Sequence, residues 1–589
     1  MRMIFRICLV LPVLMAASAA QAIEPDAPDR LIDHDEAVGI VVRQTLDGEA
    51  PASTEYGRHV QKSLAGFYSA RASRPLWVTR DGLNARAKAA IAEIERADQY
   101  GLEPKNFKLP TLAAGTDHAN PPTAELARAE LMLSHAVLTY AWHAKGGRVD
   151  PRKLSRNLDR GPTPPDPGEV MVAMASADDA AAFLRGLHPK HAQFEKLRQK
   201  YNALRRGRSA NERITIPPGP KLEQGVTHSQ VALLRKRLDI HTPTKTGNPE
   251  FFDAKLADAV RAMQKAHGLK VDGVVGNGTR RALNRRISNG EKVQRLLINM
   301  ERWRWMPENL GGDAGQYVWV NIPEFRVRVV QDGKIKLTER VITGKVTHQT
   351  PVFSDEMEWV EFHPVWYVPN SIKIKEILPY LKNSDRILER HDLRMRCPRG
   401  VGRTGGGGVF GGGSWSGDIR RCSFTQPPSA KNVLGFFKFK FPNKHSVYLH
   451  DTPQRYLFVN GVRTFSHGCV RVRNPQRLAE LILGKDQGMT ASRISAIVKG
   501  PRVTRQQILK KRVPVHITYF TARVTDSGKL VFFGDYYGHD RRIGLALNGK
   551  ATRVAAGASE PRGPRTRVAG NGGSGRSRTW VSGAFSQAR

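Results

Sequence analysis

Cysteine is scarce in this sequence: 589 residues contain only four, which excludes a small fold held together mainly by disulfides. Acidic residues are also few, 54 against 93 basic ones, and the net charge of +39 favours anionic partners such as nucleic acid, a membrane surface or a carboxylate-bearing polymer. Beyond the first 22 residues, no stretch is apolar for long enough to span a membrane. At about 150 residues per domain, the length predicts three to four domains.

The N-terminus has the pattern of a secretory signal. Arg2 and Arg6 form a positive region, residues 7–17 are mostly apolar, and Ala20-Gln21-Ala22 is an A-x-A cleavage site. The alternative is an uncleaved membrane anchor, but the apolar run is shorter than the roughly 20 residues that a span needs. We therefore expect export with cleavage after residue 22, which disfavours nucleic acid as a partner and allows membrane association only if the signal is retained. Loss of Cys8 leaves three cysteines, so at least one is free or pairs with another chain.

Hydrophobic periodicity divides the rest of the chain into segments. Residues 23–57 form an entry segment, 58–201 a helical domain, 202–221 a basic, Pro- and Gly-containing linker, and 222–287 a small unit of three helices. From Tyr317 the period changes to two, which predicts a β-rich domain over 315–500 with an extension at 501–548. The expected strands are 317–322, 325–330, 337–342, 446–450, 457–460, 469–472, 515–520 and 530–533, with an Asp332-Gly333 hairpin turn and helices at 372–381 and 475–483. The Arg-, Gly- and Ser-rich tail, 551–589, is predicted to be disordered.

One segment of the β-rich domain contains the elements of a cysteine nucleophile. A predicted strand ends at His450, and another begins at Cys469 after the turn Ser466-His467-Gly468. If the two strands lie close together, the imidazole can activate the thiol, which needs a base to become a thiolate. Gly468 permits a tight turn whose backbone N–H groups can face an oxyanion. An ordinary packed Cys–His pair and a zinc site are the alternatives, although no C-x-x-C or H-E-x-x-H motif accompanies these residues.

The three-helix unit resembles the peptidoglycan-binding module. The matching residues are Gln264, Gly268-Leu269, Asp272-Gly273, Gly276 and Thr279, followed by Leu283. A helical spacer without binding activity is the alternative.

The segment around Cys469 resembles the signature of the L,D-transpeptidase catalytic domain. That signature is His450, fifteen intervening residues, and then Ser-His-Gly-Cys-Val-Arg over 466–471. Further matching stretches are 350–354, 366–369, 373–378, 432–435, 438–443 and 447–453. Together with the helical domain and the binding module, the resemblance covers about 60–548 and extends to the large, multidomain periplasmic members of the family.

The resemblance implies an α+β multidomain fold, with a helical scaffold and a three-helix module ahead of the β-rich catalytic domain. It also implies an acyltransferase that cross-links diaminopimelate residues of peptidoglycan stem peptides in the periplasm, with no cofactor and no metal. Cys469 would be the nucleophile and His450 the general acid and base, while His467 and Gly468 would orient the site and complete an oxyanion pocket. Arg471, Ser466, Trp366 and Tyr367 are the candidate substrate-binding residues. Each of these four residues also has a structural alternative. That alternative is an ion pair for Arg471, a turn-forming role for Ser466, and core packing for Trp366 and Tyr367.

Two features depart from the family pattern. His363 precedes the Pro-x-Trp element where the family often has Asn, and a stretch with ten glycines over 400–417 lies in the expected lid, 385–430. Cys397 and Cys422 flank this stretch, and we hypothesise that they form a disulfide; two unpaired thiols are the alternative. An L,D-carboxypeptidase or amidase, and an inactive wall-binding scaffold, remain the rival functions, because hydrolysis needs the same nucleophile and base.

Overall fold

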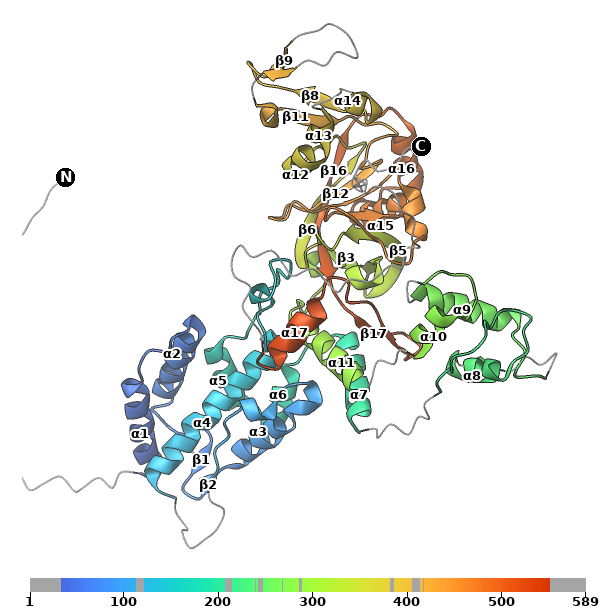
Figure 1. Cartoon of the computed structure of the whole chain (residues 1–589). Helices are drawn as coiled ribbons and strands as arrows, with labels where there is room; N and C mark the ends of the chain where they lie inside the picture. The colour runs from blue at the N-terminus through green and yellow to red at the C-terminus, as the bar shows by residue number, and fades with distance from the viewer. Residues whose placement is uncertain are drawn as a thin grey trace, which may run out of the picture. The chain divides into compact units, whose positions relative to one another are not determined.

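The computed structural model describes residues 33–550, apart from 113–120, 207–213, 239, 242–246, 267–268, 285–288, 382–385, 405–413 and 417. The predicted signal segment, the C-terminal tail and most of the glycine-rich stretch therefore lie outside the described residues. The chain divides into two compact units, one made of the residues up to Ala87 and Leu109–Ser134, the other of Lys88–Lys108 and His135 onward. Figure 1 labels many of the elements of both units. None of the described helices combines the length and hydropathy that crossing a lipid bilayer requires.

The first unit is helical, and a buried carboxylate organises its core. Its elements are α1 (His34–Gly48), α2 (Glu55–Ala70), the short hairpin β1 (Val78–Thr79) and β2 (Gly82–Leu83), and the first part of α4 (Thr123–Ala141). Glu130 on α4 accepts hydrogen bonds from the backbone N–H groups of Leu76, Trp77 and Val78 and from the hydroxyl of Tyr68. Each oxygen of this buried carboxylate is therefore satisfied, which fixes the hairpin against the helices.

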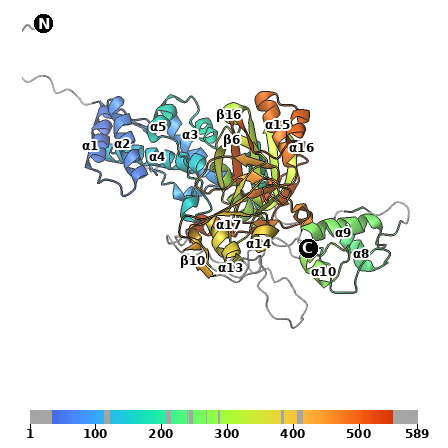
Figure 2. The same cartoon turned by 90° about the horizontal axis from the view of Figure 1, so that it is seen from above.

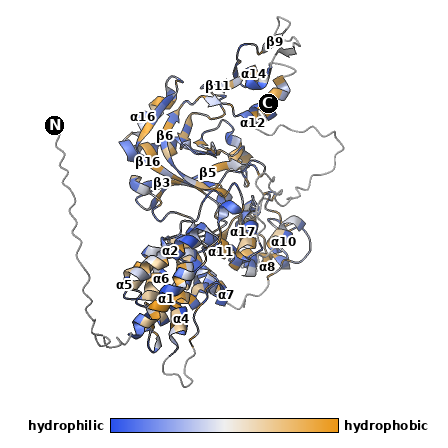
Figure 3. Cartoon of the chain, turned by 90° about the vertical axis from the view of Figure 1, so that its left-hand side faces the viewer, coloured by the Kyte–Doolittle hydropathy of each residue, from blue (hydrophilic) through white to orange (hydrophobic). Residues whose placement is uncertain are grey.

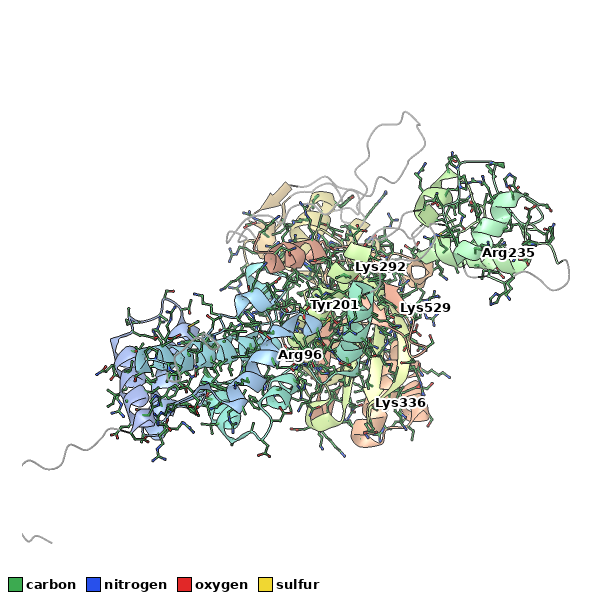
Figure 4. All side chains as sticks on the ribbon, turned by 90° about the horizontal axis from the view of Figure 1, so that it is seen from below. Arg96, Tyr201, Arg235, Lys292, Lys336 and Lys529 are labelled. Atoms are coloured by element: carbon green, nitrogen blue, oxygen red, sulfur yellow. A yellow bond between two sulfur atoms is a disulfide. The ribbon has the colours of Figure 1, made fainter. Side chains whose placement is uncertain are left out.

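The second unit begins with the rest of the helical domain. It contains most of α3 (Ala85–Glu95), the end of α4, α5 (Pro167–Ser176), α6 (Ala180–Gly186) and α7 (Ala192–Arg206), and it continues after the three-helix module with α11 (Asn289–Arg304). Asp166 and Asp179 cap α5 and α6 by accepting backbone N–H groups of the first turn. Tyr201 on α7, labelled in Figure 4, packs with Leu296 and Met300 of α11 in one apolar cluster.

The three-helix module has an apolar core of its own. Its helices are α8 (Ser229–Leu238), α9 (Ala254–Ala266) and α10 (Asn277–Asn284), and ten buried side chains between Ile216 and Leu283 pack between them. Arg235, labelled in Figure 4, is buried and pairs with Asp253 at 3.0 Å. The Gln264 amide bonds to Asp272 Oδ1, Thr279 Oγ1 and the backbone of Gly273 and Val274. Four of the residues that carried the resemblance, Gln264, Asp272, Gly273 and Thr279, therefore form one turn clasp, and Leu283 belongs to the apolar core. Gly268 lies outside the described residues.

The β-rich domain is built on a nine-stranded sheet that closes on itself. The strand order is β14-β5-β15-β13-β12-β6-β16-β3-β4, and β4 pairs additionally with β5. The strands are β3 (Gln316–Asn321), β4 (Arg326–Gln331), β5 (Lys334–Gly344), β6 (Phe353–Phe362), β12 (Phe437–Lys440), β13 (Leu449–His450), β14 (Thr464–Ser466), β15 (Val470–Val472) and β16 (Arg505–Thr518). Helices α15 (Pro475–Gln487) and α16 (Ala491–Lys499) lie side by side at one flank of the sheet (Figure 2).

The core of this domain follows from the alternating pattern of its strands. Figure 3 shows hydrophobic and hydrophilic residues mixed along strands such as β6 and β16. Because successive side chains of a strand point to opposite faces, one set faces the core. Buried residues of the strands pack with Leu478, Ile482 and Ile494 of the two helices. After β16 the chain adds the hairpin β17 (Ala522–Val524) and β18 (Leu530–Phe532) and ends its described part near α17 (His539–Leu547).

A small subdomain at residues 366–426 projects from the sheet between β6 and β12, and the name lid is used for this whole subdomain, which begins before the range 385–430 expected from the sequence. It contains β7 (Trp366–Tyr367), α12 (Asn370–Ile372), the π-helical turn η7 (Lys373–Ile377), α13 (Leu378–Leu381), α14 (Arg386–Arg390), β8 (Arg394–Arg396), β9 (Gly402–Thr404), β10 (Ser414–Ser416) and β11 (Ser423–Gln426). Its own apolar cluster includes Trp366, Ile377, Leu381 and Phe424. The lid elements gather at the top of Figure 1.

The strand prediction at 457–460 is wrong. The structure has a 3-10 helix there, η9 (Arg455–Val459), because two of its apolar residues face solvent rather than a sheet: Tyr456 is 54% exposed and Val459 is 72% exposed. The strand expected from residue 446 begins only at Leu449, since Ser446 has a φ of 54° and breaks the extended backbone. The hairpin turn at Asp332-Gly333 is confirmed, with both residues at positive φ between β4 and β5.

Candidate active site

Neighbouring parallel strands bring the predicted nucleophile and base to one face of the sheet. β13 pairs with β15 so that Leu449 lies opposite Val470 and His450 opposite Arg471. Leu449 and Val470 are fully buried in the core. Side chains alternate along a strand, so His450, Arg471 and the residue just before β15, Cys469, belong to the opposite face.

Tyr448 is the neighbour that contacts the Cys469 thiol. The backbone and the phenol hydroxyl of Tyr448 both hydrogen-bond the sulfur, and Sγ lies 3.9 Å from the carbonyl oxygen of Ser446. Burial raises the pKa of the Cys469 thiol above its ordinary value, although the two bonds from Tyr448 and the charges of Arg471 and Lys438 offset part of the increase. The resting sulfur is therefore a protonated thiol at neutral pH.

His450 is buried, and its hydrogen bond defines which nitrogen can act as a base. Nδ1 lies 2.5 Å from the carbonyl oxygen of Asp451. A carbonyl only accepts, so Nδ1 carries the proton and Nε2 retains the lone pair. Burial, and next the positive charge of Arg471, lower the pKa of His450 to about 3. The imidazole is therefore neutral at neutral pH, as a general base must be.

The turn before Cys469 is closed by bonds within itself. The Ser466 hydroxyl donates to the Cys469 carbonyl at 2.6 Å and accepts from the Gly468 N–H at 3.1 Å. Gly468 has a φ of 121°, a region that side chains rarely allow, and Thr350 donates to its carbonyl at 2.7 Å. Ser466 therefore shapes the turn, and the N–H of Gly468 is engaged by that serine.

His467 and Arg471 reach different neighbours. His467 Nε2 lies 2.7 Å from Oε1 of Glu376 in the lid. Arg471 is buried and donates from Nη1 to Gln454 at 2.7 Å, while its Nε has no hydrogen-bond partner among the described residues. Burial lowers the pKa of Arg471 from its ordinary value, yet the guanidinium stays charged at neutral pH.

Of the two aromatic candidates, Trp366 joins the site and Tyr367 lies at the lid surface. Trp366 is buried in the lid cluster, and its side chain hydrogen-bonds that of Tyr448. It thereby supports the phenol that contacts the Cys469 thiol. Tyr367 is 71% exposed.

Further residues of the site were not predicted. The alternation Tyr448-Leu449-His450 already indicates that Tyr448 shares the face of His450, and this signal was sufficient to find it. Lys438 on β12 lies opposite His450, with Nζ 5.1 Å from the centre of the Tyr448 ring and 3.5 Å from Glu361. The charges of Lys438 and Glu361 therefore line the face of the sheet that carries His450.

A segment of the helical domain also supports the site. Leu158 forms a parallel bridge with Val352, and Asp159 accepts from Lys444 at 2.9 Å and from His445 at 2.7 Å. His445 immediately precedes Ser446, whose carbonyl contacts the Cys469 thiol. Asp159 is 286 residues away from His445 in the chain, and no local sequence pattern indicates this contact.

Cys397 and Cys422 form a disulfide, which confirms the hypothesis made from the sequence. Cys469 is a free cysteine, partly buried. Within the described parts of the chain, no group of three or more His, Cys, Asp or Glu side chains is arranged to hold a metal ion.

Comparison with protein families assigns three regions. Residues 315–515 match the L,D-transpeptidase catalytic domain, residues 227–283 the family described as "Putative peptidoglycan binding domain", and residues 62–200 the family described as "Scaffold domain". A "Putative L,D-transpeptidase" of Haemophilus influenzae is 30% identical over 257 residues, which are 43% of this chain and 50% of that protein. The chain thus spans about half the length of this curated relative.

Two solved structures align with about half of the chain. The L,D-transpeptidase of Xylanimonas cellulosilytica is 16% identical, with 51% of this chain and 99% of that one covered and a TM-score of 0.15. A fused Zn-dependent amidase/peptidase/peptidoglycan-binding protein of Clostridium acetobutylicum is 12% identical, with 51% and 100% covered and a TM-score of 0.14. These TM-scores are too low for any conclusion about fold or site. The matches by family and by curated relative agree with the fold described above: this chain contains a catalytic domain of the L,D-transpeptidase family, preceded by a helical scaffold domain and a peptidoglycan-binding domain.

Proposed function

We propose that this protein is an exported, periplasmic L,D-transpeptidase that cross-links diaminopimelate residues of peptidoglycan stem peptides through a thioester on Cys469. One observation carries the proposal: a free thiol and a neutral, buried imidazole lie on one face of adjacent strands, within a domain of this family. His450 has Nδ1 bound to a carbonyl, which leaves Nε2 as the nitrogen that accepts a proton.

In the first half-reaction, Cys469 attacks the carbonyl carbon of the third residue of a tetrapeptide. The thiol proton passes to Nε2 of His450 as the S–C bond forms, because thiol and imidazole are both neutral at rest. The C–N bond to the terminal D-alanine then breaks, and the imidazolium returns the proton to the departing amine. The products are a thioester on Cys469 and free D-alanine.

In the second half-reaction, the side-chain amine of another diaminopimelate attacks the thioester carbon. Its proton moves to His450, the C–S bond breaks, and the sulfur recovers a proton from the imidazolium. A new amide bond joins the two stem peptides, and the enzyme returns to its resting state. If water takes the place of the amine, the product is a tripeptide, and the enzyme is a carboxypeptidase.

Arg471 is suited to hold a carboxylate of the donor peptide. Its guanidinium is buried beside the nucleophile, its Nη1 donates to the neutral amide of Gln454, and its Nε is left without a partner among the described residues. A substrate carboxylate would satisfy both the charge and the donor. His467 and Gly468 orient the nucleophile turn in this proposal, and the peptidoglycan-binding domain retains the polymer.

Incubation with purified wall that carries tetrapeptide stems tests the proposal. Diaminopimelate-linked dimers in the muropeptide profile are the expected product, with D-alanine released in equal amount. Cys469→Ala should yield neither. Tripeptides without dimers would establish hydrolysis in place of transpeptidation, and an unchanged profile would reject both activities.

A carbapenem tests the acyl-enzyme separately, because opening of its β-lactam ring by the thiol needs only the first half-reaction. We expect one covalent adduct on the intact wild-type protein and none on Cys469→Ala. An adduct of equal yield on the alanine variant would place the reactive group elsewhere.

A further inference from the structure

The lid is tied to the nucleophile turn through one short helical element, η7. At one end of η7, the Lys373 ammonium donates to the carbonyls of Arg420 at 2.6 Å and Cys422 at 3.0 Å. At the other end, Oε1 of Glu376 lies 2.7 Å from Nε2 of His467. The same turn of helix therefore holds the disulfide-bearing part of the lid and a residue two positions before Cys469.

The Glu376–His467 pair is sheltered from solvent. The side chain of Glu376 is 11% exposed and that of His467 is 19% exposed. The His348 ring packs against His467 with the ring centres 4.8 Å apart, and the charges of Lys345, Lys375, Glu376 and His467 all act on His348. Glu376 thus supplies negative charge to a cluster that is otherwise made of basic side chains.

The pair determines the orientation of the His467 ring. A carboxylate oxygen accepts and does not donate, so Nε2 of His467 is the protonated nitrogen. The rest of the turn is held by Ser466 and Thr350, whose bonds go to the backbone of Gly468 and Cys469. The His467 side chain connects this turn to the lid through Glu376.

We propose that Glu376 is a positioning residue for the nucleophile turn, which it holds from the lid through the His467 ring. This inference rests on the proposed function, since positioning matters only if Cys469 attacks a substrate. The role is one of orientation: Glu376 keeps the turn in the geometry that presents the thiol, and a turn that is free to shift presents it less often. Small displacements of an attacking atom are costly, so loss of the pair should slow acylation about tenfold or more.

Three lid variants of the full-length protein test this role. Glu376→Ala removes the carboxylate, Glu376→Gln keeps a side-chain oxygen that can accept from Nε2, and Glu389→Gln changes an exposed glutamate of the same subdomain as a matched control. Carbapenem acylation is followed by intact mass, and the folded fraction is obtained from thermal unfolding. We expect the acylation rate of Glu376→Ala at saturating carbapenem to fall about tenfold, with an unchanged half-saturating concentration. Glu376→Gln should recover most of this rate. The Glu389→Gln control should stay within about twofold of the wild-type rate.

NMR of labelled histidine gives a readout that does not depend on catalysis. In wild type, the nitrogen shifts of His467 should report a proton on Nε2, and Glu376→Ala should change this pattern, whereas Glu389→Gln should not. The inference would be overturned if Glu376→Ala were acylated at the wild-type rate per folded molecule. It would also be overturned if the His467 signals did not change in this variant. If wild type itself is not acylated, the proposed function fails, and the NMR result still decides whether Glu376 orients His467.

Discussion

At the scale of single residues, the proposed chemistry depends on two groups whose pKa values move in opposite directions. Burial raises the pKa of the Cys469 thiol, and burial together with Arg471 lowers the pKa of His450 to about 3. Both pKa shifts favour a neutral Cys469 thiol beside a neutral His450 imidazole over a thiolate–imidazolium pair. The enzyme would therefore form its thiolate only during attack, unlike cysteine enzymes that keep a stable ion pair.

This assignment predicts the pH dependence of alkylation at Cys469. His450 is already deprotonated above about pH 4, so it adds no inflection between about pH 5 and about pH 8. The alkylation rate with iodoacetamide should rise with pH until the pH reaches the pKa of the thiol, which burial raises. The rate should therefore level off only at a pH above the ordinary pKa of a cysteine thiol. Peptide mass analysis across about pH 5 to about pH 10 measures this rate at Cys469. A plateau below neutral pH would instead indicate a resting thiolate.

Tyr448 offers a second prediction at this scale. Its hydroxyl hydrogen-bonds the sulfur and is itself bound by Trp366, so Tyr448→Phe removes one bond without removing the ring. A hydrogen bond to a charged group is worth about 1.5–3 kcal/mol, so we expect acylation to slow by roughly tenfold to a hundredfold and the pKa of the thiol to rise. Tyr367→Phe makes the same chemical change at a side chain that is 71% exposed and should leave the rate unaltered. Equal rates for the two variants would show that the hydroxyl does not act on the sulfur.

At the scale of elements, the site depends on a segment of the helical domain. Asp159 binds Lys444 and His445 directly before Ser446, and Leu158 is bridged to Val352. Burial alone would raise the pKa of Asp159, but the hydrogen bonds from Lys444 and His445 outweigh it and leave this pKa lowered. A carboxyl whose pKa is lowered by folding stabilises the folded state above its ordinary pKa, and this contribution is lost as the pH falls through the lowered value.

Asp159→Asn should therefore be less stable than wild type at neutral pH, by on the order of 1 kcal/mol. The difference should shrink below about pH 4, where the wild-type carboxylate becomes protonated. Denaturant unfolding at several pH values measures it, with Asp526→Asn as control, because Asp526 is 97% exposed and pairs with Lys196 at 3.8 Å. A stability difference that does not change with pH would mean that the charge of Asp159 contributes nothing.

The sequence pattern predicted local elements well and distant contacts poorly. The Asp332-Gly333 hairpin and the strands ending at His450 and starting near Cys469 follow from alternation and turn chemistry, which act over a few residues. The long strand β6 carries Asp355, Glu356, Glu358 and Glu361 among its apolar residues, and these charges conceal a strand that pairs on both sides. Asp159 and Glu376 reach the site through tertiary packing, so no spacing along the chain indicates them.

At the scale of the whole molecule, the proposed function places catalysis and wall retention in separate cores. The residues that hold Cys469 and His450 belong to the closed sheet, while the peptidoglycan-binding domain packs around its own apolar cluster and its Gln264 clasp. The net charge of +39 gives the whole chain a favourable interaction with a carboxylate-rich polymer, but charge is screened by salt and does not select a wall structure. In the proposed function, the folded peptidoglycan-binding domain adds retention that survives screening by salt.

Deletion of residues 214–284 should therefore separate the two properties. The variant should be acylated by a carbapenem at the wild-type rate, because no residue of the active site is removed, but its binding to purified wall at high salt should fall several-fold in a pull-down. Cys469→Ala supplies the reciprocal control, since it should bind wall as wild type does and form no adduct. If the deletion leaves wall binding at high salt unchanged, retention resides in the catalytic domain or in the scaffold, and the three-helix module is a spacer. If the deletion instead slows acylation while the protein remains folded, the module takes part in shaping the active site.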